Sequence, residues 1–269
     1  MSFELNSIFF PITATPKGSV GIKEIAPCRS LSRYVHCFWE REPTFRSSAV
    51  RIIPDFCCDI IIPLDCDGYG GFCGVSNRSF IAENVGNVFG IRFFAWAYGA
   101  FSDVAAEKLF NGGIPARELF EGFDAFETDI RAALNTEERV RLAQDYLLRL
   151  LISDNENSVV MNGLYYAVNN CCRVRARDLE LYCAANIRTI ERGFLKVLGT
   201  SPKHAVELLR YQMLWQDCIS DGFDVLDSVS KYDYYDQAHL CNNFKRFHGI
   251  GISKARNEYK MLSHFYNTL

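Results

Sequence analysis

The sequence lacks the long apolar runs and the amino-terminal charge pattern of membrane and secreted proteins. The best candidate for a membrane span, residues 93–101, is bounded by Arg92 and Asp103 and falls far short of the roughly 18 residues required. No cluster of positive charge precedes a long apolar run near the start, so nothing indicates a secretory signal. Glycine and proline make up only 26 of 269 residues, which excludes collagen-like and low-complexity chains. We expect a globular, cytoplasmic protein without membrane contact.

The sequence also lacks the motifs of common enzyme classes. There is no glycine-rich phosphate loop, no His-Glu-x-x-His pair and no nucleophile elbow. The glycine-rich residues 68–71 lack the context of a phosphate loop. We expect no enzyme activity and no cofactor, with a catalytic amino-terminal domain attached to a DNA anchor as an alternative.

The eleven cysteines do not suit a disulfide framework, because their number is odd and some are adjacent in the chain. We therefore expect reduced thiols. Four of them invite a metal or redox interpretation: Cys57, Cys58, Cys66 and Cys73. Their spacings match no zinc knuckle, and small buried thiols are common in protein cores. We expect no metal, and a thiol-sensing regulator stays an alternative.

The formal net charge of −3 is unevenly distributed. Residues 1–170 hold 15 Lys and Arg against 21 Asp and Glu, whereas residues 171–260 hold 14 against 11. The carboxyl-terminal part is therefore mildly basic, which by itself is a weak indication of a polyanionic partner.

Two changes of pattern divide the chain into three parts. Short apolar runs broken by Gly, Pro and Asn predict strands near 36–39, 51–53, 60–62, 71–75 and 87–94. Helical spacing then predicts a helix over 137–151, and a polar run ends it. The predicted fold class is α+β, with a β-rich sensing domain at 1–112, a helical connector at 113–157 and an all-α domain at 158–269. This last domain contains two helix-turn-helix units joined by a long helix.

The first unit consists of predicted helices at 178–183 and 187–198, with Asn186 as the N-cap of the second. Ile190 and Phe194 mark its core face. The opposite face is polar and mostly basic, with Arg188, Glu191, Arg192 and Lys196. An α-helix fits the major groove of DNA, where arginine can donate two hydrogen bonds to guanine. A helical hairpin with a solvated charged face is the other interpretation.

A second unit follows in the same order, with helices at 225–232 and 236–247 and a turn at 233–235. Its core face contains Leu240, Phe244 and Phe247. Its outer face presents Gln237, His239, Asn242 and Asn243, followed by Lys245 and Arg246. Glutamine and asparagine can bond adenine, and the cations suit phosphates.

A single helix is predicted between the units. Ser201 is its N-cap, Pro202 takes the first helical position and Gly222 follows its end. About 18 residues give a length near 27 Å. Because this helix is apolar on more than one side, we expect it to pack against both units and to hold their second helices at a fixed spacing. Recognition helices on one face of B-DNA should lie about 34 Å apart.

A family resemblance extends over about residues 173–259. It is carried by NIRTIERGF at 186–194, GTSPK at 199–203, LRYQ at 209–212, YYDQAHL at 234–240 and FKRFHG at 244–249. These segments resemble AraC-type transcription regulators. The resemblance implies sequence-specific binding to double-stranded promoter DNA and, for most such proteins, activation of transcription, with RNA polymerase as a further partner. It assigns the contacts in consecutive major grooves to Arg188, Glu191, Arg192, Gln237, His239 and Asn242.

The chain departs from the family pattern at three positions. Glu180 stands where a small residue is usual, Asp233 where the second turn usually has glycine, and Ile252 where proline often follows. We expect the second turn to be strained or looser. Gly193, inside a recognition helix, costs about 1 kcal/mol in helix propensity relative to alanine.

In the amino-terminal part, charged residues lie beside strand-like apolar runs. A charge next to a buried sheet needs a partner or a ligand. We hypothesise a pocket for a small polar effector lined by Trp39, Asp55, Asp59, Arg92 and Phe93; a structural ion pair is the alternative. Segments 37–39, 53–61 and 90–93 are similar to the amino-terminal domain of a poorly characterised subset of the same regulators, which implies no particular ligand.

Two further questions stay open at this point. The helix at 137–151 could mediate a homodimer or could pack on the β-rich domain of a monomer. The rival function is a helical protein-interaction module with a degenerate DNA-binding motif, and its binding would not weaken steeply as salt rises.

Overall fold

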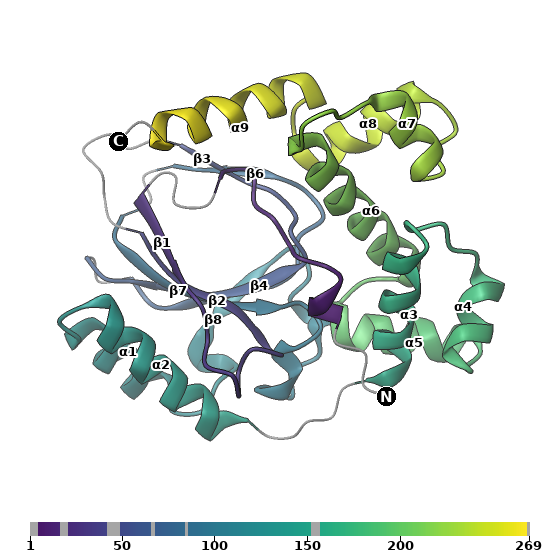
Figure 1. The fold of residues 1–269 in the computed structure, drawn as a ribbon. Helices are drawn as coiled ribbons and strands as arrows, with labels where there is room; N and C mark the ends of the chain where they lie inside the picture. The colour runs from purple at the N-terminus through teal and green to yellow at the C-terminus, as the bar shows by residue number, and fades with distance from the viewer. Residues whose placement is uncertain are drawn as a thin grey trace.

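The computed structural model describes residues 5–16, 21–41, 49–65, 68–83, 86–151 and 157–267. Figure 1 shows a β-rich part beside a group of helices, with the helix α6 running between the strands and the last helices. The predicted α+β fold class is confirmed. No helix in the described ranges is long and apolar enough to cross a membrane.

The β-rich part is built on a six-stranded antiparallel sheet with the order β1-β2-β7-β4-β5-β8. Its strands are β1 (Ile22–Ile25), β2 (Val35–Arg41), β7 (Val88–Phe94), β4 (Cys57–Pro63), β5 (Gly71–Cys73) and β8 (Gly113–Pro115). A second, two-stranded sheet pairs β3 (Val50–Ile52) with β6 (Phe80–Ala82). Each predicted strand has a counterpart here, whereas β1, β6 and β8 were not predicted.

The two faces of the large sheet have different chemistry, because successive side chains on a strand point to opposite sides. One face is apolar and fully buried, and includes Phe38, Ile60, Phe89, Ile91 and Phe93. The other face, with Trp39, Asp59 and Arg92, is directed toward a cavity that β3 and β6 also line.

Two helices belong to this part of the chain, α1 (Phe123–Ala132) and α2 (Thr136–Leu150), and Figure 1 shows them together beside the sheet. Arg139 of α2 reaches Glu40 of β2 at 3.1 Å, and Gln144 accepts a hydrogen bond from the Cys28 amide at 2.6 Å. The apolar stripe of α2 is buried, including Ala143 and Leu147. The predicted helix at 137–151 therefore packs on the β-rich part. Short 3-10 turns occupy Leu5–Ser7, Tyr98–Ala100, Ala106–Lys108 and Ala116–Glu118.

The rest of the chain is helical. Its elements are α3 (Ser158–Asn169), α4 (Ala176–Cys183), α5 (Ile187–Leu198), α6 (Pro202–Ile219), α7 (Val225–Lys231), α8 (Gln237–His248) and α9 (Ile252–Asn267). Both predicted helix-turn-helix units and the long helix between them are confirmed as elements. Ser201 caps α6 by accepting a hydrogen bond from the His204 amide, as predicted.

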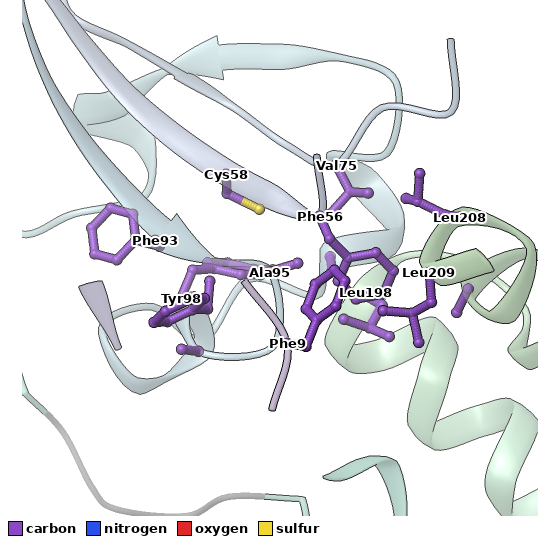
Figure 2. Close-up of a cluster of buried hydrophobic side chains, with 14 of the residues drawn as sticks. Phe9, Phe56, Cys58, Val75, Phe93, Ala95, Tyr98, Leu198, Leu208 and Leu209 are labelled. Atoms are coloured by element: carbon purple, nitrogen blue, oxygen red, sulfur yellow. The ribbon is translucent and has the colours of Figure 1, made fainter. Parts of the chain in front are cut away.

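Apolar side chains join the two parts of the chain. Figure 2 shows the cluster at this junction, in which the amino-terminal part meets α5 and α6: Phe9, Phe56, Val75, Leu198, Leu208 and Leu209. Each is at most 4 % exposed. Full burial of one large apolar side chain contributes about 1.5–3 kcal/mol, so this cluster holds the helical part firmly against the strands.

Candidate nucleic-acid interface and a cavity between the sheets

The first helix-turn-helix unit is fixed by caps at the start of α5. The Asn186 side chain accepts a hydrogen bond from the Thr189 amide at 3.0 Å, which confirms the predicted N-cap. Glu180 of α4 accepts from the Ile187 amide at 2.7 Å, so this departure from the family pattern also caps α5. Ala184, in the turn, has a left-handed backbone with φ of 49°. These contacts set the direction of α5 relative to α4.

The two faces of α5 are separated as predicted. Ile190, Phe194 and Leu198 are buried. Arg188, Glu191, Arg192 and Lys196 are exposed. Lys196 also lines a second cavity of about 410 Å³ together with residues of the β-rich part, including Tyr34 and Trp96, so it lies at the end of α5 nearest the strands.

Gly193 is buried on the inner side of α5. A Cβ atom added there would lie 3.1 Å from Val160 Cγ2 of α3, and one added at Gly163 of α3 would lie 3.1 Å from the Phe194 ring. The two glycines therefore allow α3 and α5 to approach closely, and this packing offsets the helix-propensity cost predicted for Gly193.

The second unit has the same construction. Asp236 caps α8 by accepting a hydrogen bond from the His239 amide at 2.7 Å, and Leu240, Phe244 and Phe247 are buried. Asp233 adopts φ of 56°, the left-handed conformation that glycine takes at no steric cost. The strain expected in this turn is therefore present.

The predicted contact residues of α8 are exposed: Gln237, His239, Asn242, Lys245 and Arg246. Asn243 is half-buried and accepts a hydrogen bond from the Tyr234 hydroxyl at 3.0 Å. Arg246 forms an ion pair with Glu207 of α6 at 2.8 Å. Lys245 is thus the better placed of the two cations for an external anion.

The helix α6 contacts α3, α5, α8 and α9, which confirms that it bridges the two units. Its Tyr211 hydroxyl lies 3.0 Å from Nδ1 of His248 at the end of α8. Burial lowers the pKa of His248 to about 3, so the imidazole is neutral. The 18 residues of α6 span about 27 Å.

A partly open cavity of about 230 Å³ lies between the two sheets. At its base, Arg92 Nε is 3.0 Å from Asp59 Oδ1, Arg92 Nη1 is 3.4 Å from Asp55 Oδ2, and Trp39 Nε1 donates to Asp59 Oδ1 at 2.9 Å. Trp39, Asp59 and Arg92 come from the adjacent strands β2, β4 and β7. The predicted ion pair and the predicted pocket thus coincide.

Burial shifts the ionisation of this cluster. It raises the pKa of Asp55 to about 6, against the attraction of Arg92, and Asp59 raises it further. Burial opposes the charge of Arg92, but Asp59 and Asp55 outweigh it, so the pKa of the guanidinium is raised. Arg92 stays charged, and Asp55 titrates near neutrality.

Phe93 does not line this cavity. As the neighbour of Arg92 on β7 it points to the opposite face, where its ring packs against Phe72, Phe101 and Phe120 and is fully buried. Gly90 was not predicted as a site residue, yet it shapes the cavity. A Cβ added to it would lie 2.0 Å from Trp39 Cε2, so only glycine allows the indole to lie across β7.

The cavity wall is hydrogen-bonded directly to α6, which the sequence did not indicate. Gln212 is fully buried; its Oε1 accepts from the Ile12 amide at 2.9 Å, and its Nε2 donates to the Ile12 carbonyl at 3.1 Å and the Pro54 carbonyl at 2.6 Å. Trp215 Nε1 donates to the Thr13 carbonyl at 3.0 Å. Thr13 and Pro54 both line the cavity. Nothing in the sequence distinguishes Gln212 from Gln216, the other glutamine of α6.

The cysteines do not gather into a metal site. In the described part of the chain, no group of three His, Cys, Asp or Glu side chains could hold a metal ion, and no disulfide is formed. Burial raises the pKa of the Cys57, Cys58 and Cys73 thiols, which disfavours the reactive thiolate. Cys66 lies outside the described residues.

Comparisons with known proteins find one matching sequence family and several solved structures at low sequence identity. A sequence-family model described as a domain of unknown function, DUF6597, matches residues 23–115. No curated protein matches the chain. Three solved structures of ToxT from Vibrio cholerae are similar at 10 %, 9 % and 8 % identity, with TM-scores of 0.43, 0.41 and 0.41. These matches cover 82 %, 88 % and 90 % of this chain and 99 %, 96 % and 96 % of the other. Such values do not establish a shared function.

Proposed function

We propose that this chain is a sequence-specific DNA-binding transcription regulator of the AraC type, an activator controlled by a small effector in the β-rich part. In this proposal α5 and α8 enter consecutive major grooves of promoter DNA, and RNA polymerase is the partner of the activator. The proposed sensing domain is 1–112, the connector 113–157 and the DNA-binding domain 158–269.

One observation carries the proposal: two helices, each the second of a helix-turn-helix unit, expose the polar and basic side chains predicted to contact DNA and bury the opposite face. Arg188 and Arg192 suit guanine, Gln237 and Asn242 suit adenine, and Lys245 suits a phosphate. An ordinary helical bundle has no need of this repeated order at the two ends of one rigid helix.

Effector control is supported by the contacts between the cavity and α6. Thr13 and Pro54 lie in the cavity wall and at the same time accept hydrogen bonds from Trp215 and Gln212. A ligand that favours one arrangement of this wall also favours one position of α6, and the recognition helices follow α6. Arg92→Ala is expected to change regulated promoter output; unchanged folding together with unchanged regulation would remove the cavity from the mechanism.

The test of DNA recognition uses a duplex selected from a random library by the full chain. Arg192→Ala should weaken binding to the selected duplex by about 1–3 kcal/mol and relax the base preference locally. Lys245→Ala should weaken binding to selected and random duplexes alike and lower the salt slope by about 1. Arg141→Ala, an exposed arginine on α2, is the control and should change neither quantity.

Two results would overturn this proposal. The first is a chain whose binding to any duplex is insensitive to salt, since phosphate contacts release counterions; that result favours a helical protein-interaction module. The second is equal loss on selected and random duplexes for both Arg192→Ala and Lys245→Ala. A reporter gene placed behind the selected duplex tests activation, for which transcription must rise when the chain is present.

A further inference from the structure

The two helix-turn-helix units can be compared position by position, because the same caps and turns mark both. In each unit the first helix has an N-cap, a left-handed residue follows that helix, and the second helix has an N-cap of its own. The corresponding residues are Arg175 and Asp224, Ala184 and Asp233, and Asn186 and Asp236. The buried positions correspond as well, since Ile190 and Phe194 of α5 match Leu240 and Phe244 of α8. Differences in charge between the units can therefore be assigned to particular positions.

At the three corresponding positions the second unit carries carboxylates that the first unit lacks. Asp224, Asp233 and Asp236 are all exposed. Residues 175–199 hold five Lys and Arg against three Asp and Glu, whereas residues 224–249 hold three against four. The first unit is therefore cationic and the second slightly anionic, although both are proposed to approach the same polyanion.

Ion pairs reduce the cationic character of the second unit further. Lys231 Nζ lies 2.7 Å from Asp217 Oδ2 of α6, and Arg246 is paired with Glu207 of the same helix. Among the described residues, Lys245 is left as the cation of this unit without an ion pair, whereas none of the five cations of the first unit forms one. The attraction for phosphates is thus concentrated in the first unit.

The three carboxylates lie in the part of the second unit that comes nearest to a bound duplex. In a helix-turn-helix unit the first helix crosses the DNA backbone, and the N-terminal residues of the second helix contact base edges. Asp224 is the N-cap of α7, and Asp233 and Asp236 lie between α7 and α8. Negative charges at these places repel the phosphates across water without touching them, and salt screens this repulsion.

We infer that the two units hold DNA unequally: the first unit supplies most of the attraction for the phosphates, whereas Asp224, Asp233 and Asp236 of the second unit weaken the hold on any sequence. The helix α8 then contributes base recognition and little affinity, because Gln237 and Asn242 are neutral. This inference assigns the shares of the two units in the proposed function and rests on it.

The test removes the three charges without removing the caps or the turn. Asparagine is as good an N-cap as aspartate and also adopts the left-handed conformation, so the triple variant Asp224→Asn, Asp233→Asn, Asp236→Asn keeps the local structure. Fluorescence anisotropy measures the affinity of the full chain for the selected duplex and for random duplexes. At about 50 mM salt both affinities should rise by about tenfold, and their ratio should stay unchanged, because phosphates carry no sequence information. The rise should shrink at about 200 mM salt.

A reciprocal variant and a control accompany the triple variant. Asn186→Asp places a carboxylate at the start of α5 and keeps the cap, so both affinities should fall by about threefold. Asp129→Asn removes an exposed carboxylate from α1, in the β-rich part, and should change neither affinity.

The inference is overturned if the triple variant binds no more tightly than the unmodified chain, or if Asp129→Asn has the same effect as the triple variant. Should the triple variant fail to fold, Asn186→Asp decides, and an unchanged affinity in that variant overturns the inference. Failure of the proposed function looks different, because the unmodified chain then shows no salt-dependent binding to any duplex, and this inference falls with it. A chain that binds DNA with the expected salt dependence but does not respond to the three substitutions loses this inference alone.

Discussion

Replacing Gln212 by leucine tests whether α6 is tied to the β-rich part by hydrogen bonds. Gln212 is fully buried and makes three hydrogen bonds to backbone groups some 158 to 200 residues away in sequence. Leucine has a similar volume, so the substitution removes the bonds without leaving a large cavity. The Ile12 amide, the Ile12 carbonyl and the Pro54 carbonyl then lose their partner.

The loss of folding stability in Gln212→Leu depends on how well water can reach the three backbone groups that lose their partner. A buried backbone group without a partner costs about 1–3 kcal/mol. The bond to Pro54 is buried, whereas the two bonds to Ile12 are partly accessible, so we expect a total loss of about 3–5 kcal/mol. The control is Gln216→Leu, one turn further along α6, which removes a single exposed bond to the Phe10 carbonyl and should cost less than about 1 kcal/mol.

Urea unfolding followed by far-ultraviolet circular dichroism and by tryptophan fluorescence measures both variants. Trp215 donates to the Thr13 carbonyl at the same junction, so its fluorescence reports on separation of the two parts. For Gln212→Leu we expect a lower midpoint and two transitions that no longer coincide. If Gln212→Leu costs no more than Gln216→Leu, the argument that this amide holds the junction is wrong.

Three further predictions concern the backbone and the cavity. Ala184→Gly should raise stability by about 0.5–1 kcal/mol, because relief of the left-handed strain at φ of 49° exceeds the added entropy of the unfolded chain; a lower melting temperature would contradict this. Gly90→Ala should displace the Trp39 indole and lower stability by about 1–3 kcal/mol, as measured by urea unfolding. The control is Gly251→Ala, which places the added methyl group in open space and should not have this effect. Equal losses in the two variants would contradict the close contact between Gly90 and Trp39. The pKa of Asp55 is raised to about 6 in the folded protein, so the native state binds more protons than the unfolded state between about pH 4 and pH 6 and loses stability as pH rises through that range. Relative to that of the unmodified chain, the free energy of unfolding of Asp55→Asn should therefore rise by roughly 3 kcal/mol between pH 4 and pH 7, as measured by urea unfolding at each pH. A difference between the two proteins that does not depend on pH would contradict the raised pKa of Asp55.

The helical half was predictable because its signals are local. Asn186, Ser201 with Pro202, and Asp236 each mark the start of a helix within one turn of the residues they cap. The apolar spacing of the following residues then fixes which face is buried. This is why the exposed faces of α5 and α8 could be assigned from the sequence before any tertiary contact was known.

The β-rich half was predicted less completely for a physical reason. The long strands β2, β4 and β7 have seven residues each, and apolar residues make up most of each strand, which is visible in the sequence. The missed strands β1, β6 and β8 have three or four residues each and contain no fully buried side chain, so they exist only through their pairing partners. Phe93 was grouped with Arg92 by position in sequence, although neighbours on a strand face opposite sides. The Gln212 contacts depend on residues too distant in sequence for any local pattern to reveal.

The position of α5 follows from contacts at both of its ends and at its middle. At its start, Glu180 and Asn186 accept from its first amides. At its middle, Gly193 lets it lie against Val160 of α3. Just after its end, Gly199 has φ of +71° and sits so close to the Ala106 carbonyl of the β-rich part that an added Cβ would be 2.5 Å from that oxygen. Because the last contact belongs to the β-rich part, the proposed effector control would act here: a rearrangement of that part would move the exposed face of α5 as a rigid unit, and α6 would carry the displacement toward α8.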